Sequence, residues 1–195
     1  MRTTYDDTRR HILESGQRLI GMRGFVGVGL SEILAEAAIP KGSFYHYFGS
    51  KEQYGKALLE QYLDDYVHAI ERMFAPDGTP ARARLMRYWQ HWLTSTVDTC
   101  EGAARCLIIK LSAEVADLSE DMRLTLRNGT DQLIARIAGC IAEGQADGSL
   151  PADLNAAETA QTLYQMWLGA GLLTKLRLDP SALQNAMAAT QQLLR

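Results

Sequence analysis

The stretch that decides the fold is PKGSFYHYFGSK, residues 40–51. It follows a segment from Gly29 to Ala38 in which apolar residues recur at helical intervals. Ile39-Pro40 ends this first helix, because a residue before proline avoids helical geometry, and proline is tolerated where the next helix begins. Two short helices joined by a tight turn predict a helix-turn-helix, whose second helix enters the major groove of DNA.

In the second helix, the spacing of the residues separates core-facing from outward-facing side chains. Phe44 and Phe48 lie four positions apart and should face the core, so the residues between them point outward. The alternative is a surface loop whose aromatic residues pack on a neighbouring helix, which would require the turn, the aromatic triplet and both lysines to coincide by accident. We predict that the residues in contact with DNA are Ser31, Lys41, Gly42, Ser43, Tyr45, His46, Tyr47 and Lys51.

The start of the first helix carries half of a capping signal. Glu32 follows Gly29 by three positions, so its carboxylate can reach back to a free backbone N–H group. Glycine is tolerated at the cap but supplies no side-chain acceptor, which weakens the cap by a few tenths of a kcal/mol.

These motifs together resemble a known family. Arg23-Gly24-Phe25, Leu30-Ser31-Glu32-Ile33, residues 41–48 and Ser50-Lys51 are similar to the DNA-binding domain of TetR-type transcriptional repressors, over residues 5–55. The resemblance implies an all-α fold of about nine helices, with a three-helix DNA-binding domain at 1–52 and a helical sensing and dimerisation domain at 53–195. It also implies a homodimer on a palindromic double-stranded operator, and a regulator rather than an enzyme.

The composition of the chain limits the number of domains and the class of protein. The chain has 195 residues, 47% of them hydrophobic, which is enough for one or two domains with a core. No apolar run reaches about 18 residues and no apolar leader follows Met1, so we expect neither a membrane span nor a secretion signal. Three cysteines match no disulfide framework or zinc pattern. We therefore expect a cytoplasmic protein without metal or cofactor.

Charge gives little support to DNA binding. The net charge is −3. Residues 1–52 hold seven Lys or Arg and six Asp or Glu, against 13 and 17 in the rest. Affinity for DNA must therefore come from clustered contacts rather than from a bulk positive field.

The rest of the chain is predicted to be helical, with no alternation typical of strands. A loop is expected at Cys100-Glu101-Gly102. The TetR resemblance implies that the last two helices form the dimer interface as a four-helix arrangement. These helices are rich in Leu163, Leu168, Leu172, Leu183, Met187 and Leu193. The predicted helices cover residues 5–22, 51–74, 81–98, 104–116, 119–146, 154–176 and 180–194.

An aromatic set in the C-terminal part has two interpretations. Aromatic residues at helical spacing usually fill a core. They can also line a small-molecule pocket between helices, as bundles commonly do. The residues concerned are Tyr88, Trp89, Trp92, Tyr164 and Trp167.

Cys106 is the second regulatory candidate. It lies just after the predicted loop, and a thiol near a helix N-terminus is stabilised as thiolate. Lys110 follows four residues later on the same face, whereas Lys175 lies in an otherwise apolar stretch. The plain alternative is that Cys106 is a small buried hydrophobic residue.

The segments 106–115 and 117–123, together with Trp167-Leu168-Gly169-Ala170 and Lys175, are similar to the NemR-type branch of the TetR family. The resemblance implies that Cys106 senses electrophiles or oxidants with Lys175 as its partner. Cys100 and Cys140 do not clearly match that branch, so we interpret them as structural, with Cys100 as a candidate resolving thiol. Two rivals stay open: a repressor with a reversible non-covalent inducer in the aromatic pocket, and a thiol enzyme such as a peroxidase.

Overall fold

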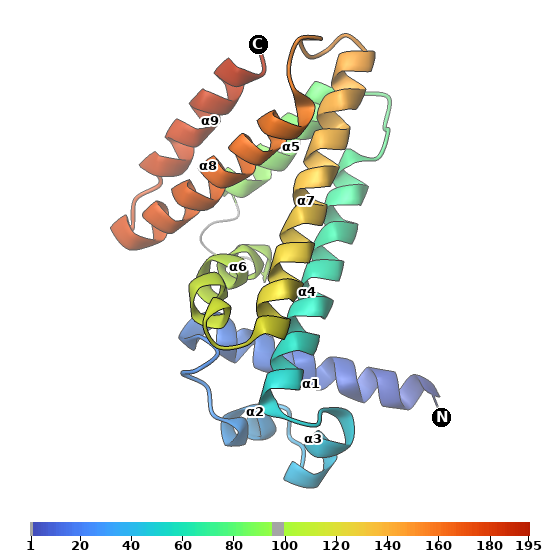
Figure 1. The fold of residues 1–195 in the computed structure, drawn as a ribbon, viewed down its shortest axis with the longest axis vertical. Helices are drawn as coiled ribbons and strands as arrows, with labels where there is room; N and C mark the ends of the chain where they lie inside the picture. The colour runs from blue at the N-terminus through green and yellow to red at the C-terminus, as the bar shows by residue number, and fades with distance from the viewer. Residues whose placement is uncertain (1, 95–99) are drawn as a thin grey trace. The chain divides into compact units, whose positions relative to one another are not determined.

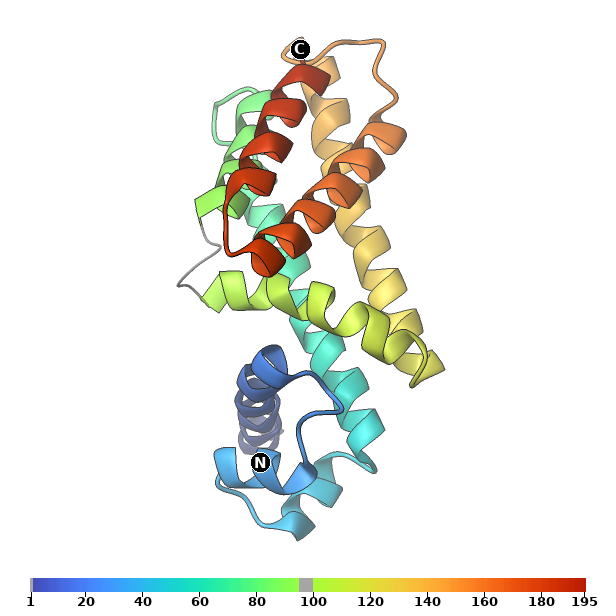
Figure 2. The same cartoon turned by 90° about the vertical axis from the view of Figure 1, so that its left-hand side faces the viewer.

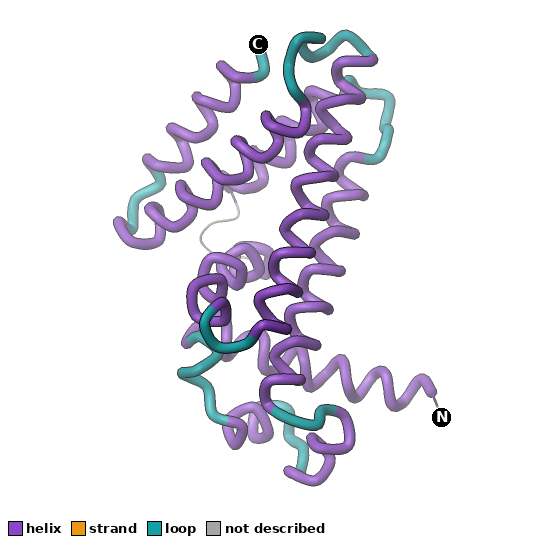
Figure 3. The backbone as a smooth tube through the Cα atoms, in the orientation of Figure 1, coloured by secondary structure: helices purple, strands orange, loops and turns teal. Residues whose placement is uncertain are grey.

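The computed structural model describes the backbone of residues 2–94 and 100–195, and the side chains of 5–94 and 107–195. Within these ranges the chain forms nine helices and no strand, which confirms the all-α prediction (Figures 1 and 3). The helices are α1 (Arg2–Arg23), α2 (Leu30–Glu36), α3 (Lys41–Tyr47), α4 (Lys51–Phe74), α5 (Ala81–Thr94), α6 (Cys100–Ala116), α7 (Glu120–Ala146), α8 (Ala156–Arg177) and α9 (Ser181–Leu193).

The helices group into two compact units that do not follow chain order. The first unit joins residues 1–64 with 103–128, and the second joins 65–102 with 129–195. Most of α6 and the first part of α7 therefore pack with the N-terminal helices. The functional boundary between residues 52 and 53 stays a prediction.

The core of the first unit is built around Tyr54 of α4. Its ring is fully buried and lies 5.4 Å from that of Phe44 and 5.0 Å from that of Phe48. Its hydroxyl donates to the carbonyl of Ile12 in α1 at 3.1 Å. A Cβ atom on Gly16 would lie 1.8 Å from this hydroxyl, so glycine is required where α1 crosses the tyrosine. One side chain thus joins α1, α3 and α4.

In the second unit, hydrogen bonds hold the start of α5 to its neighbours. The carboxylate of Asp147 accepts from the N–H of Ala81 at 2.8 Å, which satisfies a free donor of the first turn. Arg84 is buried and donates to the carbonyl of Phe74, at the end of α4, and to Glu143 of α7 at 2.8 Å. The end of α4, the start of α5 and α7 are therefore held by charge-assisted hydrogen bonds.

Helices α8 and α9 run antiparallel and pack on each other (Figures 1 and 2). Trp167 of α8 is fully buried, and its indole N–H donates to the hydroxyl of Thr190 in α9 at 2.9 Å. That hydroxyl in turn donates to the carbonyl of Ala186 at 2.7 Å. The buried polar groups of this pair are thus mutually satisfied.

One local prediction is wrong. The loop expected at Cys100-Glu101-Gly102 is helical, because α6 begins at Cys100. Cys106 consequently lies in the second turn of α6, whereas the stabilising effect of a helix dipole is confined to the first turn. The argument from the helix N-terminus for a reactive Cys106 thiolate is therefore lost.

Candidate DNA-binding surface and regulatory residues

Helix α3 is anchored by two phenylalanines, as predicted. Phe44 and Phe48 are 0% and 3% exposed, and their rings lie 5.3 Å apart. The N–H of Phe48 closes the helix on the carbonyl of Phe44 at 2.8 Å. The helix therefore has one buried edge, and the rest of its circumference is available for contact.

The predicted DNA-contacting residues lie mostly on that free surface. Tyr45 is 48% exposed, while Ser43 and Tyr47 are half-buried. Tyr5 of α1 stacks against this surface, with its ring 4.6 Å from Tyr47 and 5.6 Å from His46. No pattern in the sequence predicted this contact, because Tyr5 is distant from α3 along the chain. The exposed members of the predicted set are Ser31, Lys41, Gly42, Tyr45 and His46.

Gly42 has no internal packing reason to be glycine. A Cβ atom built there would meet nothing within 4 Å. Glycine inside a helix lowers stability by about 0.5–1 kcal/mol relative to alanine. An outward-facing glycine is what close approach of the α3 backbone to a partner surface would favour.

Lys51 has a structural contact that was not predicted. Its ammonium donates to the carbonyl of Phe25 at 2.8 Å and lies 4.6 Å from the centre of the Phe25 ring. Partial burial lowers its pKa below the ordinary lysine value. The residue thus fastens the loop between α1 and α2, and its contact with a DNA phosphate stays a prediction.

The capping role of Glu32 is confirmed. Its carboxylate accepts from the N–H of Gly29 at 2.8 Å and from the guanidinium of Arg23 at 2.7 and 2.9 Å. The hydrogen bonds from Arg23, followed by that from Gly29, lower the pKa of Glu32 to about 2. Because this folded value lies below the unfolded one, the stabilisation is complete above the ordinary glutamate range and is lost as pH falls through about 2.

Two residues of α6 reach the same loop and were not recognised as a pair in the sequence. Glu114 accepts from the N–H groups of Phe25 and Val26, and Lys110 donates to the carbonyl of Met22. Their spacing of four is the only signal that the sequence carries. Lys110, the alternative partner for Cys106, is thus engaged with the end of α1.

The predicted pocket residues are packed against one another. All five are at most 2% exposed, and the rings of Trp89 and Trp167 stack at 5.0 Å with an angle of 15°. The hydroxyl groups of Tyr66 and Tyr88 are hydrogen-bonded at 2.9 Å, and burial raises the pKa of Tyr88 well above its ordinary value. The indole N–H of Trp89 and the hydroxyl of Tyr164 are buried without a hydrogen-bond partner in the described residues.

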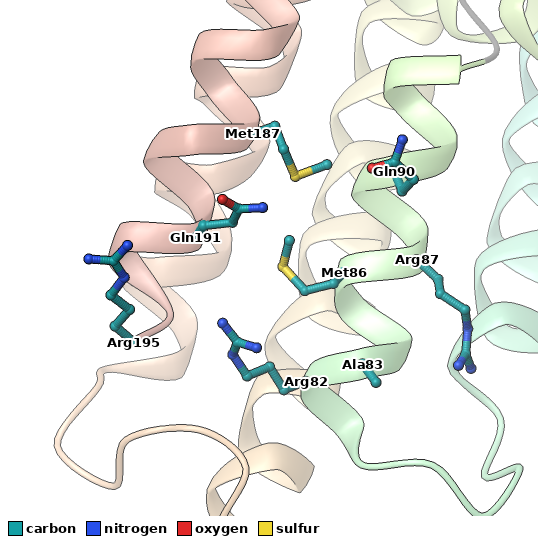
Figure 4. A pocket seen from close by; sticks show the side chains of 8 residues that line it. All are labelled: Arg82, Ala83, Met86, Arg87, Gln90, Met187, Gln191 and Arg195. Carbon is teal, nitrogen blue, oxygen red and sulfur yellow. The ribbon is translucent and has the colours of Figure 1, made fainter.

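A groove of about 530 Å³ lies elsewhere in the second unit, between α5 and α9. Figure 4 shows Met86 and Met187 projecting from the two helices into it, with Gln90, Gln191 and Arg82 around them. Arg82 also donates to the carbonyl of Leu194 at 3.1 Å. None of the five aromatic residues predicted to line a pocket contributes to this groove.

Of the predicted sensing pair, only Lys175 has a described side chain. The side chains of Cys106 and Cys100 lie outside the described residues. Lys175 is exposed in the last turn of α8. The pairing of Cys106 with Lys175 therefore stays a prediction.

The comparisons with known proteins agree with the geometry of α2 and α3. Residues 12–57 match the family model of bacterial regulatory proteins of the tetR family, and residues 81–190 match a tetracyclin repressor-like C-terminal domain. The chain is 39% identical to the HTH-type transcriptional repressor NemR of Escherichia coli K12, over 98% of this chain and 96% of that protein. The chain belongs to the TetR family.

One further relative and one solved structure support this assignment. The HTH-type transcriptional repressor DhaR of Mycobacterium sp. strain GP1 is 33% identical over 86% of this chain and 82% of its own length. The crystal structure of E. coli NemR in its reduced form matches with a TM-score of 0.91 at 39% identity, covering 97% of each chain. These relatives are transcriptional regulators, which confirms that this TetR-family chain is not an enzyme.

The described residues hold neither a membrane span nor a cluster of metal ligands. None of the described helices is both long enough and apolar enough to cross a bilayer. In the same part of the chain, no three His, Cys, Asp or Glu side chains converge as metal ligands would.

Cys140 has the environment of an unreactive thiol. It is 2% exposed on α7, and its Sγ lies 3.5 Å from the carbonyl of Ala81, to which it donates. Burial raises the pKa of the Cys140 thiol to about 11. At pH 8 about one thiol in a thousand would then be ionised, and the thiolate is the reactive form.

We predict that Cys140 reacts slowly in the folded TetR-family protein. In a Cys100→Ser/Cys106→Ser variant, N-ethylmaleimide at pH 7.5 should label Cys140 at least about a hundredfold more slowly than in the same variant unfolded in guanidinium. The rate should rise with pH up to about 11, where the thiol ionises. Mass spectrometry of timed samples gives both rates. Comparable rates in the folded and unfolded protein would contradict this account of the thiol.

Proposed function

We propose that this protein is a cytoplasmic transcriptional repressor that binds operator DNA through α3. The observation that carries the proposal is the division of α3 into a buried edge of Phe44 and Phe48 and an outward surface of polar and aromatic groups. A helix so anchored presents its free side chains in a fixed geometry, as base recognition in a major groove requires.

Roles follow from the chemistry of each side chain. Lys41 and Lys51 are expected to bind phosphates, which fix position and orientation without reading sequence. Tyr45 and His46 carry groups that can reach base edges or phosphates, and Gly42 lets the backbone come close. The ring of Tyr5 holds His46 and Tyr47 in place before DNA arrives.

We expect Tyr45→Ala to weaken operator binding about tenfold, the order of magnitude of one lost base or phosphate contact. Its stability should change by less than about 0.5 kcal/mol, because the side chain is largely outside the core. Phe44→Ala, one residue away, should instead cost about 3–5 kcal/mol of folding stability. Fluorescence anisotropy with DNA from upstream of the protein's own gene and thermal unfolding measure the two effects. Wild-type affinity in a folded Tyr45→Ala would remove Tyr45 from the interface.

The second part of the proposal is a homodimer through α8 and α9. The sequence selected six residues for this interface, but Leu163, Leu183 and Met187 are buried in the unit's own core. Leu172 and Leu193 are 44% and 42% exposed, and Leu176, which was not selected, is 70% exposed. Exposed leucines on α8 and α9 favour burial of this helix pair against a second copy.

We expect Leu172→Glu to give monomers in sedimentation velocity and to lose tight operator binding, because one half-site lacks the affinity of two. Leu118→Glu is the matched control, since Leu118 is 50% exposed in the turn between α6 and α7. It should leave the dimer intact. A wild-type protein that sediments as a monomer at micromolar concentration would contradict the dimer.

The third part of the proposal is release from DNA by modification of Cys106. Support comes from 39% identity to NemR over nearly the whole chain. An electrophilic alkene would form a carbon–sulfur bond with the Cys106 thiolate while its double bond breaks and the neighbouring carbon takes a proton from water. Hypochlorous acid would give the sulfenic acid and chloride. The amine of Lys175 could then displace water to form a sulfur–nitrogen bond.

A reversible inducer is the alternative, and one observation favours it. The indole N–H of Trp89 and the hydroxyl of Tyr164 are buried and unpaired in the described residues, although buried polar groups normally find partners. A ligand that accepts a hydrogen bond from either group would satisfy it.

The Cys106→Ser variant distinguishes covalent modification of a thiol from a reversible inducer. We expect Cys106→Ser to bind operator as the wild type does and to stay bound at an oxidant dose that releases the wild type, because the serine hydroxyl is not oxidised as a thiolate is. Anisotropy titrations with and without limiting hypochlorous acid measure this. If the Cys106→Ser variant is released from operator DNA at the same oxidant dose, thiol sensing is contradicted and the reversible inducer is favoured. Lys175→Met and Lys110→Met then identify the lysine that traps the oxidised sulfur.

A further inference from the structure

The loop between α1 and α2 has backbone groups that the two helices leave unsatisfied. Gly24 ends α1 with a φ of +83°, and its N–H closes on the carbonyl of Ile20 at 2.8 Å. The next two N–H groups, of Phe25 and Val26, point away from the helix. Consecutive amides beside a left-handed residue form a concave donor site for an anion.

Glu114 of α6 fills that site. Its two carboxylate oxygens accept from the N–H of Phe25 at 3.0 Å and of Val26 at 2.5 Å. A Cβ atom on Gly24 would lie 2.9 Å from the same carboxylate, so glycine is required both by the positive φ and by the approach of Glu114. Hydrogen bonds to a charged acceptor are about twice as strong as neutral ones.

Lys110, one turn earlier on α6, holds the other side of the junction. Its ammonium donates to the carbonyl of Met22 at 2.8 Å, where the last turn of α1 has free acceptors. A cation at a helix C-terminus also interacts favourably with the helix dipole. One face of α6 thus binds a carbonyl before Gly24 and two amides after it.

The clamped loop leads directly to the DNA-binding helices. The Phe25 ring is 4% exposed and packs so closely on α4 that a Cβ atom on Gly55 would lie 2.5 Å from it. Lys51 binds the carbonyl of Phe25, and the next residues continue into α2. Moving the loop would therefore move the start of α2, and α2 packs against α3.

We infer that Lys110 and Glu114 are positioning residues that hold the helix-turn-helix in its DNA-competent arrangement, and that α6 releases this clamp when Cys106 is modified. The release of this clamp by modification of Cys106 rests on the proposed function. Cys106 precedes Glu114 by eight residues on one helix, about 12 Å along its axis. Hydrogen bonds weaken steeply when the acceptor moves by about 1 Å, so a small displacement of α6 breaks both contacts.

The first test measures operator affinity of the full-length reduced protein. Glu114→Gln removes the charge and one of the two acceptors, and should weaken binding about tenfold or more, on the scale of a lost charge-assisted hydrogen bond. Lys110→Met should give a smaller loss. The slope of log Kd against log salt should stay at the wild-type value, because neither residue contacts a phosphate. Asp117→Asn, an exposed carboxylate just after α6, is the matched control and should bind as the wild type does.

Wild-type affinity in both Glu114→Gln and Lys110→Met would overturn the clamp. A changed salt slope would also overturn it, since it would mean that these residues act through DNA contacts. Lys110→Met removes only a partly exposed contact, so the test stands even where Glu114→Gln fails to fold.

The second test measures the factor by which limiting hypochlorous acid weakens binding. In Glu114→Gln this factor should shrink towards one, because the clamp is already open. An unchanged factor would overturn the link from Cys106 through α6. If the oxidant does not release the wild type, sensing at Cys106 fails, while the affinities of the reduced variants still decide whether the clamp exists.

Discussion

One carboxylate and two amide groups hold the junction on which the DNA-binding helices depend. Glu114 satisfies the N–H groups of Phe25 and Val26, which follow the end of α1 and precede α2. Without it, the partly buried N–H of Phe25 would lack a partner, at a cost of about 1–3 kcal/mol, whereas the N–H of Val26 is exposed to water. Any side chain at Gly24 would be strained by the positive φ and would crowd the carboxylate of Glu114, so the glycine suits both the loop and its clamp.

Around this junction, several side chains of the first unit each connect two or more elements. Lys51 binds the carbonyl of Phe25 and also begins α4. Glu32 caps α2 and pairs with Arg23, which donates as well to the carbonyl of Gly27 at 2.6 Å. Tyr54 joins α1, α3 and α4 from within the core. The surface of α3 is thus held by contacts that lie outside α3 itself.

The sequence allowed the helix-turn-helix, the family and most helix boundaries to be predicted, because these depend on local spacing. Phe44 and Phe48 four residues apart, proline after α2 and glycine with Glu32 are short-range signals. The contacts of Glu114, Lys110 and Tyr5 could not be predicted, since they join residues distant along the chain. The predicted start of α6 is wrong because a glycine such as Gly102 is a local signal for a helix stop, whereas α6 begins at Cys100 and continues through it. Several leucines of α8 and α9 were assigned to a dimer interface although they fill their own core, as spacing alone does not distinguish the two faces of a helix pair.

The central claim is that the hold of α6 on the α1–α2 loop determines whether DNA is bound. Amide hydrogen exchange of Phe25 and Val26 tests it most directly, measured by NMR before and after limiting oxidation, with Leu183 in the α9 core as reference. The account predicts that both amides are protected in the reduced protein and lose protection at the dose that releases operator, while Leu183 stays protected. Release of DNA with Phe25 and Val26 still protected would contradict it.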